Sequence, residues 1–146
     1  MKFTGPVLAD IFQGKITKWN DPQITALNPG VNLPNSNIVV VHRSDGSGTT
    51  YVWTSYLSSQ SPSWNQTVGA SKSVPWPTGI GAPGNEGVAN AIKGSSNTLG
   101  YVELNYALTT GMPVVLIKNS AGKFAAPSLD TTEAKTGIEH LIFIFS

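Results

Sequence analysis

One short stretch of the sequence, Arg-Ser-Asp-Gly-Ser-Gly-Thr beginning at Arg43, concentrates residue types that can bind a small anion. Gly46 and Gly48 carry no Cβ atom, so the backbone there can adopt unusual angles and come close to a ligand. Ser47 and Thr49 add hydroxyl donors. Arg43 adds a planar, permanently charged guanidinium that suits the geometry of an oxyanion. Together these groups could form a site for a small tetrahedral anion.

The elements expected around this stretch would place it at the start of a helix. Residues 37–41 contain a continuous run of branched apolar side chains, which is typical of a strand buried on both faces of a parallel sheet. A helical pattern follows the stretch and runs to about residue 58. The first N–H groups of that helix have no partner within it, and its dipole favours negative charge there. Strand, small-residue loop and helix form the α/β arrangement in which helix starts face the carboxyl end of the sheet.

The same stretch has a second interpretation, in which Ser47 and Thr49 only cap the helix. Spacing alone does not separate a capping turn from an anion site. Three other motifs are excluded: no lysine follows the glycines as in a Walker loop, no third glycine completes a dinucleotide fingerprint, and the order of residues is not that of a nucleophile elbow.

The remaining pattern predicts one α/β domain with a mostly parallel sheet flanked by helices. Residues 59–84 are rich in Pro, Gly and Ser, and we expect a loop with one short strand at 73–76. Asn85 is expected to cap a helix, and Asp130 with Glu133 forms a capping box for a terminal helix. Further helices are predicted at 6–12, from Pro22 to about 27, at 85–93 and at 103–110, and further strands at 99–102, at 114–117 and after a turn at 122–124.

Composition narrows the function classes. The chain has 146 residues, which suits one domain, and only 12% of them are charged, against about 25% in typical domains. The formal net charge of +1 argues against nucleic acid as a partner. There are no cysteines, which excludes disulfides and thiol chemistry. His42 and His140 are the only histidines, so we expect no metal site and no cofactor, with His42 a strand-end residue.

Several segments resemble the periplasmic phosphate-binding proteins of bacterial phosphate ABC importers. The similarity extends in order over about residues 4–130 and is carried by five stretches: His42–Thr50, Leu8–Ile16, Lys18–Pro22, Gly84–Val88 and Leu99–Glu103.

The resemblance implies a fold, a ligand and roles for five residues. The family folds as two α/β lobes that close on one dehydrated phosphate, and this chain matches the second lobe, a single lobe of a type II periplasmic-binding-protein fold. Arg43, Ser47, Gly48 and Thr49 would bind the phosphate, and Asp45 would orient the arginine, although Asp45 also fits a helix cap. The implied partners are inorganic phosphate and the membrane subunits of the importer, and the implied location is periplasmic or otherwise extracytoplasmic.

The segments that the family's first lobe would contribute are not found in this chain. We therefore assign residues 1–135 to the lobe and residues 136–146 to an unmatched apolar tail, and recognise no signal peptide at residues 1–6. Without the first lobe's hydroxyls and carboxylate, we expect weak binding and little discrimination between phosphate and sulfate. The uncovered lobe face and the tail predict a homo-oligomer.

Two functions remain from the residues. The first is non-enzymatic phosphate binding, as a solute-binding component of the importer. The alternative is a phosphatase or another phosphoryl-transfer enzyme that uses the same loop. An enzyme would need an activated nucleophile; the Ser47 hydroxyl is available, but we find no histidine or metal cluster to activate it. Asp10, Glu86 and Glu103 lie on different predicted elements, so we assign them no catalytic role.

Overall fold

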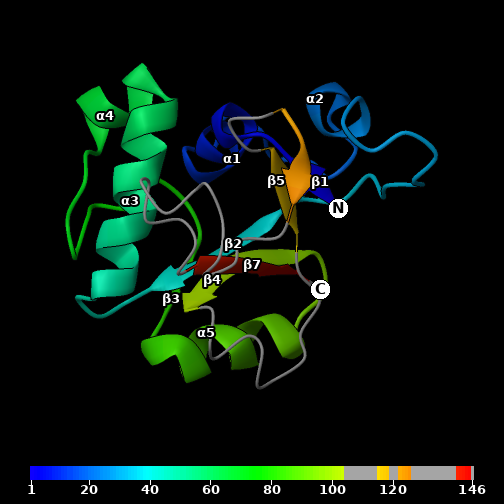
Figure 1. Cartoon of the computed structure of the whole chain (residues 1–146). Helices are drawn as coiled ribbons and strands as arrows, with labels where there is room; N and C mark the ends of the chain where they lie inside the picture. Colours follow the sequence, from blue (N-terminus) through cyan, green and yellow to red (C-terminus); the bar gives the residue numbers. More distant parts are fainter. Residues whose placement is uncertain (104–114, 119–121, 126–140, 146) are drawn as a thin grey trace.

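Helices cover both faces of a four-stranded sheet in the computed structural model of the chain (Figure 1), which describes residues 1–103, 115–118, 122–125 and 141–145. The elements in chain order are β1 (Lys2–Phe3), α1 (Gly5–Phe12), α2 (Pro22–Thr25), β2 (Val39–Arg43), α3 (Gly48–Gln60), α4 (Pro62–Thr67), β3 (Ile80–Ala82), α5 (Gly84–Lys93), β4 (Thr98–Glu103), β5 (Leu116–Lys118), β6 (Phe124–Ala125) and β7 (Leu141–Phe145). The α/β class predicted from the sequence is confirmed.

The larger sheet has the strand order β3-β2-β4-β7. Strand β2 pairs in parallel with β3 on one side and with β4 on the other, so the carboxyl ends of these three strands lie at the same edge. Strand β7 runs antiparallel to β4, with Leu141 opposite Glu103 and Phe145 opposite Leu99. A smaller sheet has the order β1-β5-β6, in which β1 and β5 are parallel and β5 and β6 are antiparallel. The tail therefore supplies a strand to the larger sheet of the same chain.

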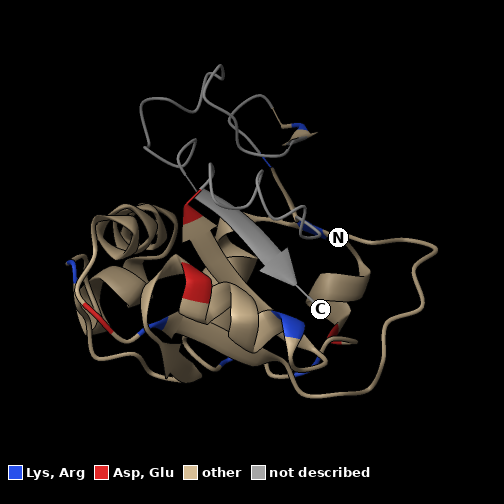
Figure 2. Ribbon diagram, turned by 90° about the horizontal axis from the view of Figure 1, so that it is seen from below, with Lys and Arg blue, Asp and Glu red and all other residues tan. Residues whose placement is uncertain are grey.

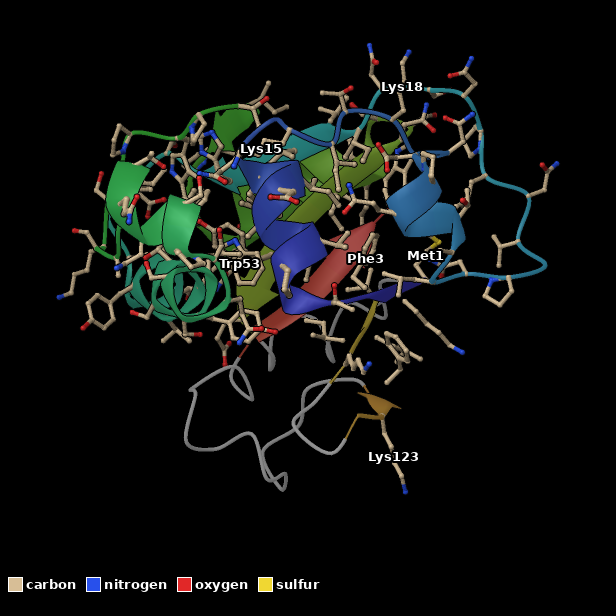
Figure 3. The ribbon with its side chains drawn as sticks, turned by 90° about the horizontal axis from the view of Figure 1, so that it is seen from above. Met1, Phe3, Lys15, Lys18, Trp53 and Lys123 are labelled. Carbon is tan, nitrogen blue, oxygen red and sulfur yellow. The ribbon has the colours of Figure 1, made fainter. Side chains whose placement is uncertain are left out.

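Each face of the larger sheet has its own apolar core. On one face α5 buries Val88, Ala89 and Ile92 against β2 and β4, as its helical spacing predicts. On the other face α1 and α3 pack together, and Trp53 of α3 lies against α1 (Figure 3). The Trp53 ring meets the Phe12 ring edge-on, with centroids 5.1 Å apart. This aromatic core positions the start of α3 above the sheet.

Local capping explains where the helices begin. Thr4 caps α1 by accepting from the Val7 amide, and Asp21 caps α2 by accepting from the Gln23 amide. Pro22 stands in the first turn of α2, where its missing N–H costs nothing. The sequence predicted α1 from Pro6 and its periodic apolar residues, and α2 from Asp21 and Pro22. Both helices are confirmed.

Some predictions in the loop-rich region were wrong. No strand forms at 73–76; the strand in this region is β3, whose Ile-Gly-Ala sequence has little intrinsic preference for extended structure and depends on pairing with β2. Helix α4 was missed although Ser61 caps it by accepting from the Trp64 amide and Pro62 occupies its first turn. The pair Ser61-Pro62 fits a loop and a helix start equally well, and burial of Trp64 decides between them.

Two further predictions need correction or lie beyond the description. Asn85 does not cap α5: the cap position is Pro83, and no side chain accepts a hydrogen bond there. Glu103 ends β4 rather than beginning a helix, while the remainder of the predicted helix at 103–110 lies outside the described residues. The expected capping box of Asp130 and Glu133 also lies outside them.

The ribbon coloured by residue type shows Lys, Arg, Asp and Glu scattered along the described residues (Figure 2). No described helix has the length and apolar character needed to cross a bilayer.

Candidate anion-binding site

The stretch singled out in the sequence lies at the carboxyl edge of the larger sheet. Arg43 is the last residue of β2, and Gly48 is the first residue of α3, so the intervening loop turns from the sheet into the helix. The Ser44 amide donates to the carbonyl of Ala82 at 3.0 Å, which ties the loop to the end of β3. Helix α5 also begins at this edge, with Gly84 two residues after Ala82. Two positive helix ends therefore meet beside Arg43.

Arg43 is held by a two-pronged ion pair with Asp45. Its Nε donates to Oδ1 at 2.8 Å and its Nη2 donates to Oδ2 at 2.6 Å. The Gly84 amide also donates to Asp45 Oδ1, at 3.1 Å. The hydrogen bonds from Arg43 and then from Gly84 hold the pKa of the Asp45 carboxyl well below its usual value, and the bond to Asp45 raises the pKa of Arg43. The carboxylate thus fixes the direction of the guanidinium at any pH near neutrality.

Asn85 is a third polar residue at this edge and was assigned a different role from sequence. Its Oδ1 accepts from Arg43 Nη1 at 3.4 Å and from the Glu103 amide at 3.2 Å. The side chain therefore links the ends of β2 and β4 instead of capping α5. The signal that could have suggested this was its place in the Gly84–Val88 stretch that resembles the family.

Ser47 is the N-cap of α3 and is already engaged with the protein. Its Oγ accepts from the Thr50 amide at 2.9 Å and donates to Thr50 Oγ1 at 2.8 Å. The Ser47 amide donates to the carbonyl of Lys72 at 2.9 Å. The amide of Ser47 is therefore not available to a ligand, whereas its hydroxyl could be redirected.

Gly48 and Thr49 supply open donors at the first turn of α3. Their amides precede the first intrahelical hydrogen bond. Neither amide, nor the Thr49 hydroxyl, has an acceptor in the part of the chain that the structure describes. These donors and the guanidinium of Arg43, whose side chain is 11% exposed, provide the chemistry to hold an oxyanion.

Tyr101 closes the site from behind. It projects from β4, is fully buried, and its phenolic oxygen accepts from the Arg43 amide at 3.2 Å and lies 2.8 Å from Thr50 Oγ1. Burial raises the pKa of the Tyr101 phenol, so the group stays protonated at neutral pH.

His42 directly precedes Arg43 in β2, and its ring packs against the protein. Its ring stacks on Trp76, with centroids 4.6 Å apart and planes 12° from parallel. Burial lowers the pKa of His42, with a smaller opposing effect from a contact to the Arg43 carbonyl. No cluster of three or more His, Asp or Glu able to hold a metal occurs among the described residues.

The five residues predicted for the site lie in one loop and the helix start that follows it. Asp45 accepts hydrogen bonds from the guanidinium of Arg43. Nothing in the described part of the chain provides a base for Ser47, because its hydroxyl contacts only Thr50. Asp10 on α1, Glu86 on α5 and Glu103 on β4 lie on separate elements, as predicted.

A mostly parallel sheet with helices on both faces and polar loops at its carboxyl edge defines one lobe of a periplasmic-binding-protein fold. Two solved structures share this fold. A crystal structure from Clostridium perfringens with bound phosphate, described as a phosphate ABC transporter substrate-binding protein, has a TM-score of 0.57 at 19% identity and covers 99% of this chain and 50% of its own. The periplasmic phosphate-binding protein PfluDING, also solved with phosphate, has a TM-score of 0.64 at 18% identity, with 99% and 51% covered.

The PBP superfamily domain model matches residues 2–140, and the chain belongs to this superfamily. Among curated proteins it is similar to the phosphate-binding protein PstS of Pasteurella multocida, at 54% identity over 90% of this chain and 38% of the relative. PstS of Haemophilus influenzae is 52% identical over 88% and 38%, and PstS of Methanocaldococcus jannaschii is 45% identical over 92% and 36%. The chain thus spans less than two fifths of the length of these relatives. The predicted resemblance to the periplasmic phosphate-binding proteins, over part of their length, is confirmed.

Proposed function

We propose that this chain binds inorganic phosphate without turning it over, as the lobe of a PstS-like solute-binding protein that grips the anion at a helix start. The observation that carries the proposal is the orientation of Arg43 by Asp45 next to the open amides of Gly48 and Thr49. The similarity to proteins named for phosphate binding supports phosphate as the ligand. By the same similarity, the partners would be membrane subunits of a phosphate ABC importer, and the location extracytoplasmic.

Each site residue has a distinct role in this proposal. Arg43 provides the charge, and Asp45 keeps the guanidinium in one direction. Gly48 and Thr49 donate their amides, and Thr49 adds its hydroxyl. Ser47 contributes its hydroxyl once the proton that it donates to Thr50 turns towards the anion. Gly48 borders open space, since a Cβ built there would meet no atom within 4 Å, and this leaves room for an anion to approach its amide.

The affinity of this lobe alone should be modest. With one lobe the anion keeps part of its hydration, and water screens the charge-assisted hydrogen bonds. We therefore expect a Kd in the range of about 1 μM to 1 mM. Phosphate and sulfate should bind with similar affinity, because every donor described above serves either anion equally well.

Titration calorimetry with both anions tests the proposal. Arg43→Ala should weaken phosphate binding at least about tenfold, since it removes a charge-assisted hydrogen bond of about 1.5–3 kcal/mol. Lys18→Ala is a matched control, because it removes an exposed positive charge far from the loop and should leave the Kd unchanged. Equal binding by the parent chain and Arg43→Ala would contradict the proposed site. Hydrolysis of a chromogenic phosphate ester that disappears in Ser47→Ala would contradict binding without turnover.

A further inference from the structure

Three hydroxyl groups form a chain that runs from the proposed phosphate site into the core. Ser47 Oγ lies 2.8 Å from Thr50 Oγ1, which lies 2.8 Å from the phenolic oxygen of Tyr101. The Arg43 amide donates to Tyr101 at the inner end, at 3.2 Å. Thr50 is 1% exposed and Tyr101 is 0% exposed, so bulk water does not reach the inner part of the chain. Two residues proposed to bind the anion, Ser47 through its hydroxyl and Arg43 through its backbone amide, are thus joined by buried oxygens.

This row of three hydroxyls has more protons to donate than it has hydrogen bonds between its oxygens. Each of the three hydroxyls has one proton to donate, but only two contacts link their oxygens. The Arg43 amide cannot take the third proton, because it is itself a donor to Tyr101. In the structure Ser47 donates inward to Thr50. The surplus proton therefore belongs to Thr50 or Tyr101, and neither has a further acceptor in the described parts of the chain.

We propose that phosphate binding reverses the direction of this hydroxyl chain, and that Thr50 and Tyr101 are positioning residues for the anion; this rests on the proposed function. Ser47 turns its proton outward to a phosphate oxygen. Thr50 then donates to Ser47 Oγ, and Tyr101 donates to Thr50 Oγ1. Every hydrogen bond in the row is then donated in the same direction, from the Arg43 amide towards the anion. Each of the three hydroxyl protons has an acceptor.

The reversal has two physical consequences for binding. The buried hydroxyl without an acceptor in the arrangement described above gains one, which favours the phosphate-bound state. Hydrogen bonds aligned in one direction also polarise one another, so Ser47 becomes a stronger donor when Thr50 and Tyr101 stand behind it. The hydroxyls can make this change by rotating about their C–O bonds, with little movement of the oxygen atoms. Thr50 and Tyr101 therefore affect phosphate through Ser47, without touching it.

A double-mutant cycle on the 146-residue chain tests this dependence on Ser47. Thr50→Val removes the hydroxyl but keeps the shape, and should weaken phosphate binding by about three- to tenfold. In a Ser47→Ala background the same substitution should change the Kd less than twofold, because no hydroxyl remains for Thr50 to support. Titrations followed by amide chemical shifts measure dissociation constants into the millimolar range, which the Ser47→Ala background requires.

Two further variants serve as rescue and control. Thr50→Ser keeps the hydroxyl and should recover the affinity that Thr50→Val loses. Thr98→Val removes another buried threonine hydroxyl, which donates to the Ile92 carbonyl at 3.4 Å at the opposite end of β4, and should leave phosphate binding unchanged.

The outcomes separate this proposal from the proposed function. If Thr50→Val weakens binding equally with and without the Ser47 hydroxyl, the hydroxyl chain is overturned while phosphate binding stands. If the parent chain binds no phosphate, both are overturned. Should Thr50→Val fail to fold, Tyr101→Phe takes its place in the cycle with the same expectation. Failure of Thr50→Ser to bind better than Thr50→Val or Tyr101→Phe would also overturn the proposal.

Discussion

Asp45 contributes more to the geometry of the site, through its pair with Arg43, than to the stability of the fold. The Asp45 side chain is 44% exposed, so water screens the attraction and the pair adds little to the free energy of folding. Its two parallel hydrogen bonds nevertheless fix the plane of the guanidinium. Because its pKa lies below the usual value of 3.8, Asp45 keeps its charge through the mildly acidic range, and the arginine stays in place there.

His42 makes the stability of the chain depend on pH. Its pKa is lowered by burial, so the unfolded state, with a pKa of about 6.5, binds the proton more readily than the folded state. The stabilisation is fully present above about pH 6.5 and is lost as the pH falls through the lowered pKa. We expect urea unfolding midpoints to drop between pH 7.5 and pH 5.5, and to drop less in His42→Gln.

Unfolding of the parent chain and of His42→Gln at the same series of pH values isolates the contribution of this histidine. If His42→Gln kept the full slope, the stack of His42 on Trp76 would not be the source of the effect.

Among the secondary-structure elements, α5 and β4 pack closely enough to restrict one position in β4 to glycine. Gly100 lies in β4 where a Cβ would stand 2.9 Å from the Val41 carbonyl oxygen and 2.7 Å from Ile92 Cδ1. The carbonyl belongs to the neighbouring strand and cannot move without disturbing the pairing of β2 and β4. Close packing of α5 on the sheet, and with it the position of Gly84 and Asn85 at the site, therefore requires a glycine here.

Gly100→Ala should lower the free energy of unfolding by about 1–3 kcal/mol, because it overpacks this contact. Chemical denaturation gives the measurement. Gly5→Ala is the matched comparison: a Cβ there meets only the flexible side chain of Gln60, and alanine is the better helix former, so the expected change is within about 1 kcal/mol. Equal losses in the two variants would show that the site of contact, backbone or side chain, does not decide the cost.

The elements illustrate what local sequence can and cannot predict. The sequence predicted α1 and α2 from a proline at each helix start, Pro6 and Pro22, and from periodic apolar residues. It predicted β2 from a run of β-branched residues. These signals are local, so they could be recognised without the fold. Strand β3 could not be predicted, since Gly79 before it has a φ of 100° and a Cβ there would be 2.5 Å from the Val40 carbonyl oxygen. That glycine is required by the neighbouring strand rather than by its own segment.

The candidate site also contains some residues that local sequence could predict and others that it could not. Arg43 and Asp45 are two residues apart, so their pairing was accessible from the sequence. Asn85 and Tyr101 reach Arg43 from 42 and 58 residues away, and only the strand order brings them there. The local motif therefore predicts the donors of the site, while the residues that hold those donors emerge from the fold.

At the scale of the whole molecule, β7 determines how the larger sheet ends. It pairs with β4 over five residues, so residues 141–145 of the segment assigned to an unmatched tail are part of the sheet. We still propose that residues 1–135 form the phosphate-binding lobe and that 136–146 are an addition to it. The earlier expectation of a homo-oligomer now concerns the outer edge of β7, since unpaired strand edges are common sites of association.

Ending the chain after Lys135 should lower the free energy of unfolding by about 2 kcal/mol or more, because β4 loses its antiparallel partner and its hydrogen bonds. Denaturation of the shortened and complete chains measures this, and removal of Ser146 alone is the control because it leaves β7 intact. Static light scattering of the complete chain tests association through β7. A strict monomer would contradict the homo-oligomer, and equal stability after shortening would contradict the role given to β7.

The antiparallel direction of β7 also determines where an attachment can be made. Phe145 lies opposite Leu99, near the amino end of β4, whereas Arg43 lies at the carboxyl end of β2. A dye or surface linker joined just beyond β7 would therefore leave from the end of the sheet opposite the proposed anion site. Attachment at this end would keep the Arg43 loop clear of an immobilising surface in an assay of the proposed phosphate binding.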